Sequence, residues 1–252
     1  MDTLFIGQKV IHLNEVGSTN TYAIDLLKDV KVPEGTVIIT DKQSNGRGQR
    51  GNVWLAEPSM NLTFSCILSP SFLNASNHFY LSKIIALAIY DALTEITKGS
   101  QHDIKIKWPN DILVNNKKIA GVLIENNFRS DQVQHSVIGI GINVNQENFG
   151  EFQNKATSLK LIHASVSVKE VLAIVCKYIE IWYLKLRSRE AYQAINEKYM
   201  ERLFLLNQWE NYSSGGSNFM GRICAVEDDG KLLMELENKS FKKFDVKQIV
   251  FP

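Results

Sequence analysis

Apolar and polar positions alternate along the chain in a way that predicts both strands and amphipathic helices. Apolar or β-branched runs predict strands at residues 10–13, 35–40, 62–68, 104–108, 118–125 and 134–142. Helical spacing of apolar residues predicts helices at residues 76–96, 168–186 and 190–205, and a shorter helix after the Gly-Ser-Thr-Asn segment at residues 17–20. Together these elements predict an α+β main domain.

A change of composition near residue 208 indicates a second module. Residues 208–218 contain the polar stretch NYSSGGSN, which is typical of a connector. Beyond it, short strands are expected near residues 220–226, 231–236 and 241–246, with a tight turn at Asp229-Gly230. We therefore expect a main domain over residues 1–207 and a small β-barrel-like domain over residues 208–252.

Composition and charge exclude several classes of protein. The chain has 252 residues, 44% of them hydrophobic and 22% charged, which is enough for a substantial core. A formal net charge of +1 argues against a dedicated nucleic-acid binder. Cys66, Cys176 and Cys224 lack the spacing of metal ligands, and we expect them to be buried in a reducing compartment. With no signal peptide and no apolar span, a soluble, cytoplasmic protein without a membrane partner is expected.

Two positively charged segments suit a phosphate-containing ligand. The sequence GRGQRG at residues 46–51, followed by Asn52-Val53-Trp54, combines glycines that let the backbone approach a ligand with arginines suited to phosphate oxygens. A solvated basic turn would have the same composition. Lys118 enters an apolar strand, where an ammonium group can stabilise a negatively charged transition state. An exposed lysine at the start of a strand is the simpler alternative.

Two further segments place polar side chains beside the predicted sheet. The sequence KWPND at residues 107–111 puts Asn110 and Asp111 at the end of a strand, where ligand sites are common, although a plain turn would also end a strand there. The sequence GIGINVN at residues 139–145 leaves room beside the sheet and places Asn143 next to that room. No dinucleotide-binding fingerprint accompanies its glycines.

Taken together and in order, these segments resemble the biotin–protein ligase family. The resemblance rests on GSTN at 17–20, Gln43, GRGQRGNVW at 46–54, KWPND at 107–111, KIAGVLIE at 118–125 and GIGINVN at 139–145, and it spans residues 10–145. The tail is similar to the small SH3-like domain of that family. The resemblance implies a central mixed or antiparallel sheet flanked by helices, of the biotin/lipoate ligase type, plus an SH3-like β-barrel.

The resemblance also implies a reaction and its partners. It implies a biotin–[acetyl-CoA-carboxylase] ligase that uses ATP and Mg²⁺ to activate biotin as biotinyl-5′-AMP. The biotin then passes to a specific lysine of a biotin carboxyl carrier protein or domain. The sequence names no metal ligands, and a monomer or a homodimer is compatible with it.

Individual residues take roles from the same resemblance. The catalytic set is Lys118, Arg47 and Arg50. The biotin-binding set is Ser18, Thr19, Asn20, Gln43, Gly46, Lys118 and Gly121. The set that binds ATP or the adenylate is Arg47, Gly48, Arg50, Trp54, Asn110, Asp111, Lys118 and Asn143.

The chain departs from the family pattern at two points, and two rival functions stay open. Gln49 stands where the commonest bacterial form has another arginine, so the loop has one positive charge fewer. Some members carry an N-terminal DNA-binding domain, but the Ser-Thr-Asn segment here begins at residue 18, so we expect no DNA partner. The rivals are a ligase for another acyl cofactor, chiefly lipoate, and a non-catalytic sensor of biotin or its adenylate.

Overall fold

The helices and strands follow the predicted order along the chain. The computed structural model describes residues 2–98, 100–246 and 248–252, apart from the side chain of Arg50. The helices are α1 (Thr19–Asp29), α2 (Phe79–Ile96), α3 (Val168–Leu186) and α4 (Ala191–Glu201). The strands are β1 (Val10–Val16), β2 (Val37–Gln43), β3 (Leu62–Leu68), β4 (Ile104–Lys107), β5 (Asp111–Val114), β6 (Lys117–Arg129), β7 (Gln132–Ile142), β8 (Trp209–Ser214), β9 (Ser217–Val226), β10 (Leu232–Leu236) and β11 (Phe241–Phe244).

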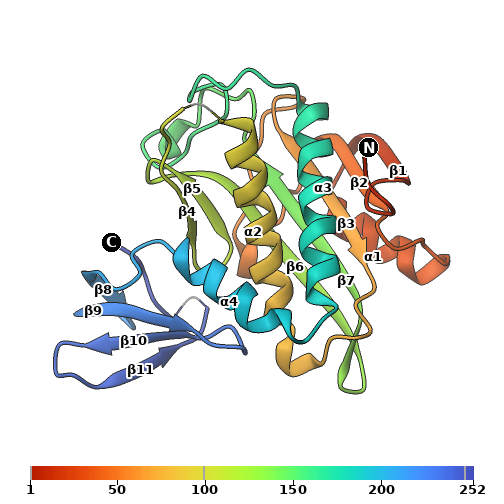
Figure 1. Ribbon diagram of the computed structural model, residues 1–252. Helices are drawn as coiled ribbons and strands as arrows, with labels where there is room; N and C mark the ends of the chain where they lie inside the picture. Colours follow the sequence, from red (N-terminus) through yellow and green to blue (C-terminus); the bar gives the residue numbers. More distant parts are fainter. Residues whose placement is uncertain (1, 99, 247) are drawn as a thin grey trace.

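Strands β1 to β7 form one mixed sheet in the order β1-β2-β3-β7-β6-β5-β4. Strands β1 and β2 run parallel, and the other neighbouring pairs run antiparallel. Helices α2 and α3 lie side by side across one face (Figure 1). They pack on alternate residues of β7, namely Ile138, Ile140 and Ile142, so the main core lies between the helices and this face.

The opposite face of this sheet is only partly covered by a helix. Helix α1 packs over β2, β3 and β7, where Ala23, Ile38, Ile67 and Val137 form a second, smaller core. We call the rest of this face, over β3, β7, β6, β5 and β4, the open face. Any ligand site on the sheet must therefore lie beside α1 on the open face.

Strands β8 to β11 form a separate antiparallel sheet in the order β11-β10-β9-β8, near α4 and β4 in Figure 1. Trp108 at the end of β4 donates a hydrogen bond from Nε1 to the carbonyl of Gly230, at 2.9 Å. Gly230 has φ +87°, and a Cβ there would lie 2.4 Å from the ring of Phe79. Only glycine can bring this turn so close to α2, so the two sheets are packed against each other through it.

The predicted fold is confirmed: a central mixed sheet flanked by helices is followed by a small C-terminal β domain of the SH3-like kind. The boundary at residue 208 stays a prediction, and β8 begins one residue after it. Among the described residues, each helix is too short or too polar to pass through a lipid bilayer.

Some elements were missed by the prediction, and others end at different residues. Strand β5 lies where only a turn was expected, and β8 lies in the supposed connector, where the glycines at 215 and 216 form the turn of a β8–β9 hairpin. Helix α4 ends at Glu201 instead of residue 205. The glycine-rich loop, expected to be irregular throughout, contains a short 3₁₀ helix at Gln49–Gly51.

Candidate active site

A row of directly paired residues crosses the open face from β3 to β4. Thr63 pairs with Gly141, Gly141 with Gly121, Gly121 with Asp111, and Asp111 with Lys107. Directly paired residues in antiparallel strands place their side chains on the same face of the sheet. We call these five residues the cross-strand row. Its two central glycines leave room on the sheet, and charged groups follow at its β5 and β4 end.

The indole of Trp54 lies on these central glycines. A Cβ on Gly141 would lie 2.3 Å from the indole carbon Cε2, and a Cβ on Gly121 would lie 3.2 Å from Cζ3. Either side chain would therefore displace the tryptophan. The indole nitrogen is buried without a hydrogen-bond partner in the described structure. We call the surface formed by Gly121 and Gly141 the glycine floor. A flat aromatic surface with a free hydrogen-bond donor above this floor suits a planar, polar ligand group.

The glycine-rich loop is folded back on itself so that it presents Trp54 to the sheet. The Trp54 N–H donates to the carbonyl of Gly46 at 3.0 Å, and the Gly48 N–H donates to the carbonyl of Asn52 at 2.7 Å. A Cβ on Gly46 would lie 2.2 Å from the Trp54 carbonyl oxygen, so the residue must be glycine for this closure. The loop therefore forms a hairpin-like flap beside the row.

Lys118 reaches the row from the neighbouring part of β6. Its Nζ lies 2.6 Å from Oδ1 of Asp111 and 5.6 Å from the centre of the Trp54 ring. This short contact is an ion pair, and apart from it Asp111 Oδ1 is buried without a hydrogen-bond partner among the described residues. The Lys118 side chain is 36% exposed and thus open to a ligand. A cation and an aromatic ring therefore lie together at this place on the open face.

Polar residues at the start of α1 form a network at the other end of the glycine floor. Gln43 Oε1 accepts from the N–H of Thr19 at 2.9 Å, and Ser65 Oγ lies 2.7 Å from Thr19 Oγ1 and 2.6 Å from Asn20 Oδ1. Ser18 is buried beside them and, within the described structure, makes no side-chain capping bond. The side-chain oxygen of Gln43 thus accepts a free N–H at the start of α1, as a capping side chain would.

Arg47 is held by an acidic partner that the sequence analysis missed. Its guanidinium donates to both carboxylate oxygens of Glu125, at 2.7 and 3.2 Å, and to Thr21 Oγ1 at 3.3 Å. Glu125 also accepts from Asn20 Nδ2 at 2.8 Å. Gly121 precedes Glu125 by four residues in β6, so both residues lie on the same face of the strand. This alternation is the sequence signal that could have placed Glu125 near the site. The side chain of Arg50, predicted to be catalytic, lies outside the described residues.

Two predicted nucleotide contacts have structural partners of their own. Asn110 Nδ2 donates to the carbonyl of Val122 at 2.8 Å, which ties the β4–β5 turn to β6. Asn143 is buried, and its Nδ2 donates to the carbonyl of Thr157 at 2.9 Å. Of the predicted residues, Lys118, Asp111, Gly121 and Trp54 are therefore brought into direct contact, whereas Asn143, just beyond the end of β7, is bonded to Thr157.

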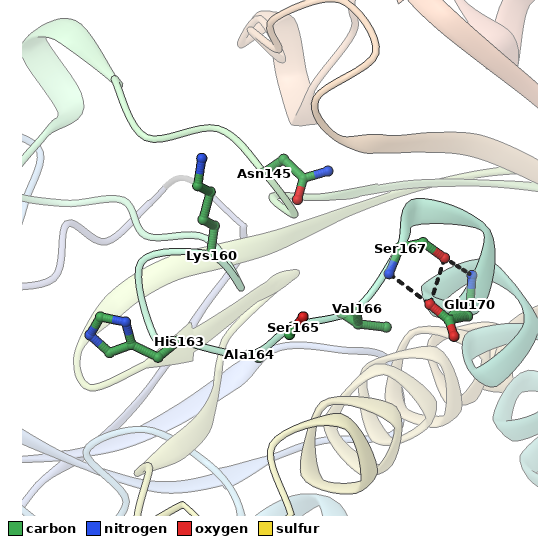
Figure 2. Close-up of a pocket in the computed structure, with 8 residues that line it drawn as sticks. All are labelled: Asn145, Lys160, His163, Ala164, Ser165, Val166, Ser167 and Glu170. Carbon is green, nitrogen blue, oxygen red and sulfur yellow. Dashed lines mark hydrogen bonds between the residues drawn. The ribbon is translucent and has the colours of Figure 1, made fainter.

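A separate polar pocket lies beyond the end of β7, as Figure 2 shows. Its walls include Asn145, Lys160, His163 and the first turn of α3. There Ser167 and Glu170 form a closed capping box, in which Glu170 N–H donates to Ser167 Oγ at 3.2 Å. These groups satisfy one another, so they are not directed at a ligand. Glycine floor, aromatic cover and cation coincide on the open face, and we place the site there.

The cross-strand row has one carboxylate and several lysines near its β4 end. Within the described residues, no cluster of three or more His, Cys, Asp or Glu side chains is placed to hold a metal ion. Asp111 is the carboxylate of the row. Burial lowers the pKa of Lys107; neighbouring Asp111 raises it, and Lys118 and Lys155 lower it. The row therefore ends in a positively charged region.

Known proteins share this sequence and architecture. The family model described as the biotin/lipoate A/B protein ligase family matches residues 14–143. The bifunctional ligase/repressor BirA of Bacillus subtilis is 34% identical over 258 aligned positions, which cover 96% of this chain and 74% of that protein. The biotin–[acetyl-CoA-carboxylase] ligase of Paracoccus denitrificans is 28% identical, covering 88% of this chain and 92% of that protein.

The solved structures agree with the sequence relatives. The structure of biotin protein ligase from Aquifex aeolicus in complex with biotin and ATP superposes with a TM-score of 0.78 at 29% identity. It covers 97% of this chain and 99% of that one, so the similarity includes both sheets. This chain therefore belongs to the biotin/lipoate A/B protein ligase family, and within that family it is a biotin protein ligase.

Proposed function

We propose that the open face binds ATP and biotin, joins them as biotinyl-5′-AMP, and passes the biotin to a lysine of a carrier protein. The observation that carries the proposal is the contact of Lys118 with Asp111 and with Trp54 above the glycine floor. An ammonium group beside an aromatic surface suits a ligand that joins a planar base to a phosphate. The similar Aquifex aeolicus protein was solved in complex with biotin and ATP.

The two ends of the floor suit the two ends of the adenylate. Biotin is small and largely apolar, so its binding calls for a shaped pocket with a few hydrogen-bonding groups. The network of Thr19, Asn20, Gln43 and Ser18 supplies such groups at one end. The flap with Gly46, Gly48 and Trp54 lies beside the floor, and its backbone and indole are placed to cover an adenylate.

The first step of the reaction places negative charge where the site carries positive charge. An oxygen of the biotin carboxylate attacks the α-phosphorus of ATP, the bond to the bridging oxygen of the β-phosphate breaks, and pyrophosphate leaves. Lys118 stabilises the charge on the phosphate oxygens, and Arg47 and Arg50 are proposed to contribute from the flap. Arg47 must first exchange part of its pairing with Glu125 for the phosphate.

A magnesium ion is compatible with the residues present. Mg²⁺ commonly takes one or two protein carboxylates together with phosphate oxygens of the substrate. Apart from its ion pair with Lys118, Asp111 Oδ1 is buried and has no hydrogen-bond partner among the described residues, so this carboxylate can serve as such a ligand. Asp111 would hold the ion, which would neutralise phosphate charge when bound.

In the second step, a neutral lysine amine of the acceptor attacks the acyl carbon, AMP leaves with the electrons of the broken acyl–oxygen bond, and the nitrogen releases a proton to solvent. We propose a biotin carboxyl carrier protein or domain as the acceptor, in line with the Paracoccus denitrificans relative named for acetyl-CoA carboxylase. The flap would keep water from the adenylate between the two steps.

Substrate competition in ATP–pyrophosphate exchange tests the choice of acyl group. Free biotin should support exchange of labelled pyrophosphate into ATP, and lipoate should neither support it nor compete at equal concentration. Exchange with lipoate but not with biotin would assign the other branch of the family. Binding of biotin without any exchange would favour the sensor instead.

A further inference from the structure

Lys107 is a cation of the cross-strand row for which the proposed adenylation chemistry has so far assigned no role. It lies half-buried at the end of β4, directly across from Asp111. Among the described side chains, no carboxylate lies within ion-pair distance of its Nζ, whereas Lys105, two residues earlier, pairs with Asp103 at 3.5 Å. Lys107 instead lies near aromatic rings, 4.9 Å from the centre of Phe251 and 6.0 Å from that of Phe204.

Its charged neighbours make this end of the row positive. Asp111 is already engaged by Lys118 at 2.6 Å, so it cannot fully compensate Lys107. The ammonium groups of Lys118 and Lys155 act on Lys107 as like charges. A half-buried cation without an ionic partner is costly, and an anion that settles beside it recovers that cost. Several cations around one carboxylate therefore favour a polyanion.

The order of residues along the row indicates which polyanion this is. In the proposed function the adenylate lies beside Trp54 and the glycines beneath it, with Lys118 at its phosphate. Neighbouring strands are about 4.8 Å apart, so Lys107 lies roughly 10 Å beyond Gly121, within reach of a triphosphate that continues along the row. Lysine binds phosphate as a compact point charge and needs no planar partner.

We infer that Lys107 binds the β- and γ-phosphates of ATP and the pyrophosphate that leaves. The inference rests on the proposed function, because it takes the direction of the bound nucleotide from it. Lys107 stabilises the leaving group, while Lys118 stabilises the phosphate at which the bond breaks. The two lysines act at different phosphates and should affect different steps.

The C-terminal domain holds Lys107 in position. The ring of Phe251 lies over Nζ, and Phe251 in turn packs edge-on against Tyr212 of β8, with ring centres 5.6 Å apart. A cation over an aromatic face is attracted by the ring and loses freedom to turn away. Phe251 is therefore a positioning residue, through which the small domain contributes to chemistry on the larger sheet.

The test compares Lys107→Met with Lys105→Met, a matched change on the same strand. Three rates are measured in Mg²⁺ buffer: formation of biotinyl-5′-AMP, its reversal by added pyrophosphate, and transfer from supplied biotinyl-5′-AMP to the carrier. Pyrophosphate takes part in the first two only. Lys107→Met should lower those two by about ten-fold or more and raise the KM for pyrophosphate, while transfer falls far less. Lys107→Arg should restore most of the loss, and Lys105→Met should resemble the unchanged protein.

Loss of all three rates in parallel would overturn the inference, because it would indicate a structural role for Lys107. So would an unchanged KM for pyrophosphate. Calorimetric titration with inorganic pyrophosphate alone gives a readout that does not need the reaction: affinity should fall about ten-fold in Lys107→Met and partly in Phe251→Ala. If the unchanged protein binds pyrophosphate in this way but forms no biotinyl-5′-AMP, the proposed function fails and the pyrophosphate site stands.

Discussion

Lys118 is the residue on which the proposed chemistry depends most. Its ammonium group pairs with Asp111, the carboxylate of the row, and its side chain is partly exposed. A phosphate that approaches from the open face can therefore reach it. Lys118→Ala should lower the rate of adenylation about 10²-fold or more, because one charge-stabilising group is lost from the transition state. Biotin affinity should fall much less. Single-turnover formation of the adenylate and calorimetric binding of biotin measure the two effects.

Lys117 provides the control for this prediction. It precedes Lys118 on β6 and is exposed. Lys117→Ala removes the same charge from the same strand without touching the row, and adenylation should be nearly unaffected. Adenylation by Lys118→Ala at a rate near that of the unchanged protein would refute the role assigned to Lys118.

We expect Gln49 to shorten the time for which the adenylate is retained in the site. A charge-assisted hydrogen bond contributes about 1.5–3 kcal/mol and a neutral one about 0.5–1.5 kcal/mol, so glutamine holds a phosphate less strongly than arginine. Gln49→Arg should slow adenylate dissociation by about ten-fold, since 1.4 kcal/mol corresponds to that factor. Stopped-flow release of biotinyl-5′-AMP measures it.

The competing explanation is that another cation already supplies the missing charge. Lys42 is a poor candidate, because its Nζ pairs with Glu15 at 3.0 Å. Arg50 and the C-terminal domain are the remaining sources. An off-rate for Gln49→Arg that is equal to or faster than that of the unchanged protein would show that the charge is already present.

At the residue scale, the resemblance of short segments to the family singled out Lys118, Trp54 and Gly121, which the structure brings into contact. Their roles in binding and catalysis stay predictions, and the sequence did not predict the pairings around them. The bonds of Arg47 to Glu125 and of Ser65 to Asn20 join segments far apart in the chain. Such contacts depend on strand register, which composition alone does not determine.

At the scale of elements, the flap over residues 44–53 is the part that should respond to ligand. Beyond Asn45, its backbone bonds lie within the flap itself, as in Trp54 to Gly46 and Gly48 to Asn52, and Val53 and Leu55 are largely exposed. Segments with few buried apolar contacts open readily. Bound biotinyl-5′-AMP should therefore slow amide hydrogen exchange across the flap. Equal protection with and without the adenylate would contradict this, and the amides of α3, far from the row, serve as the internal control.

Two strands escaped prediction for physical reasons. Strand β5 is only four residues long and begins with Asp111, so its apolar part resembles the end of a turn. Most side chains of strand β8 are polar, since most of its positions are exposed or half-buried in a small sheet that buries little area. Alternation is weak in both cases, whereas β3 and α3, with their strong apolar patterns, were predicted to the residue.

At the scale of the whole molecule, a buried lysine on α2 joins α4 to the C-terminal sheet. The side chain of Lys83 on α2 is fully buried, and its Nζ donates to Asn196 Oδ1 at 2.8 Å and to the carbonyl of Val226 at 3.2 Å. Asp228 lies 3.9 Å away, and its Oδ1 accepts from the hydroxyl of Tyr80. Burial lowers the pKa of Lys83 to about 8, although Asp228 opposes this.

This shift predicts a pH dependence of stability. Between pH 8 and 10.5 the unfolded chain binds more protons at this lysine than the folded chain, so the free energy of unfolding rises with pH. Below about pH 8 the cost of burying the charge is present in full, on the order of 3 kcal/mol. Urea unfolding from pH 7.5 to 10.5 should show this rise relative to Lys83→Met. Lys198→Met, at an exposed lysine, should leave the rise with pH unchanged. A stability difference between the unchanged protein and Lys83→Met that does not vary with pH would show that Lys83 is not the titrating group.

Formation of biotinyl-5′-AMP on the open face can be measured by mass analysis of a single turnover. The protein is mixed in excess with biotin, ATP and Mg²⁺, quenched, and examined for the adenylate and for pyrophosphate in equal amounts. We predict both products from the unchanged protein and from Lys117→Ala, and about 10²-fold slower formation from Lys118→Ala. Binding of biotin and ATP without any adenylate, or equal rates from all three proteins, would show that the open face does not carry this reaction.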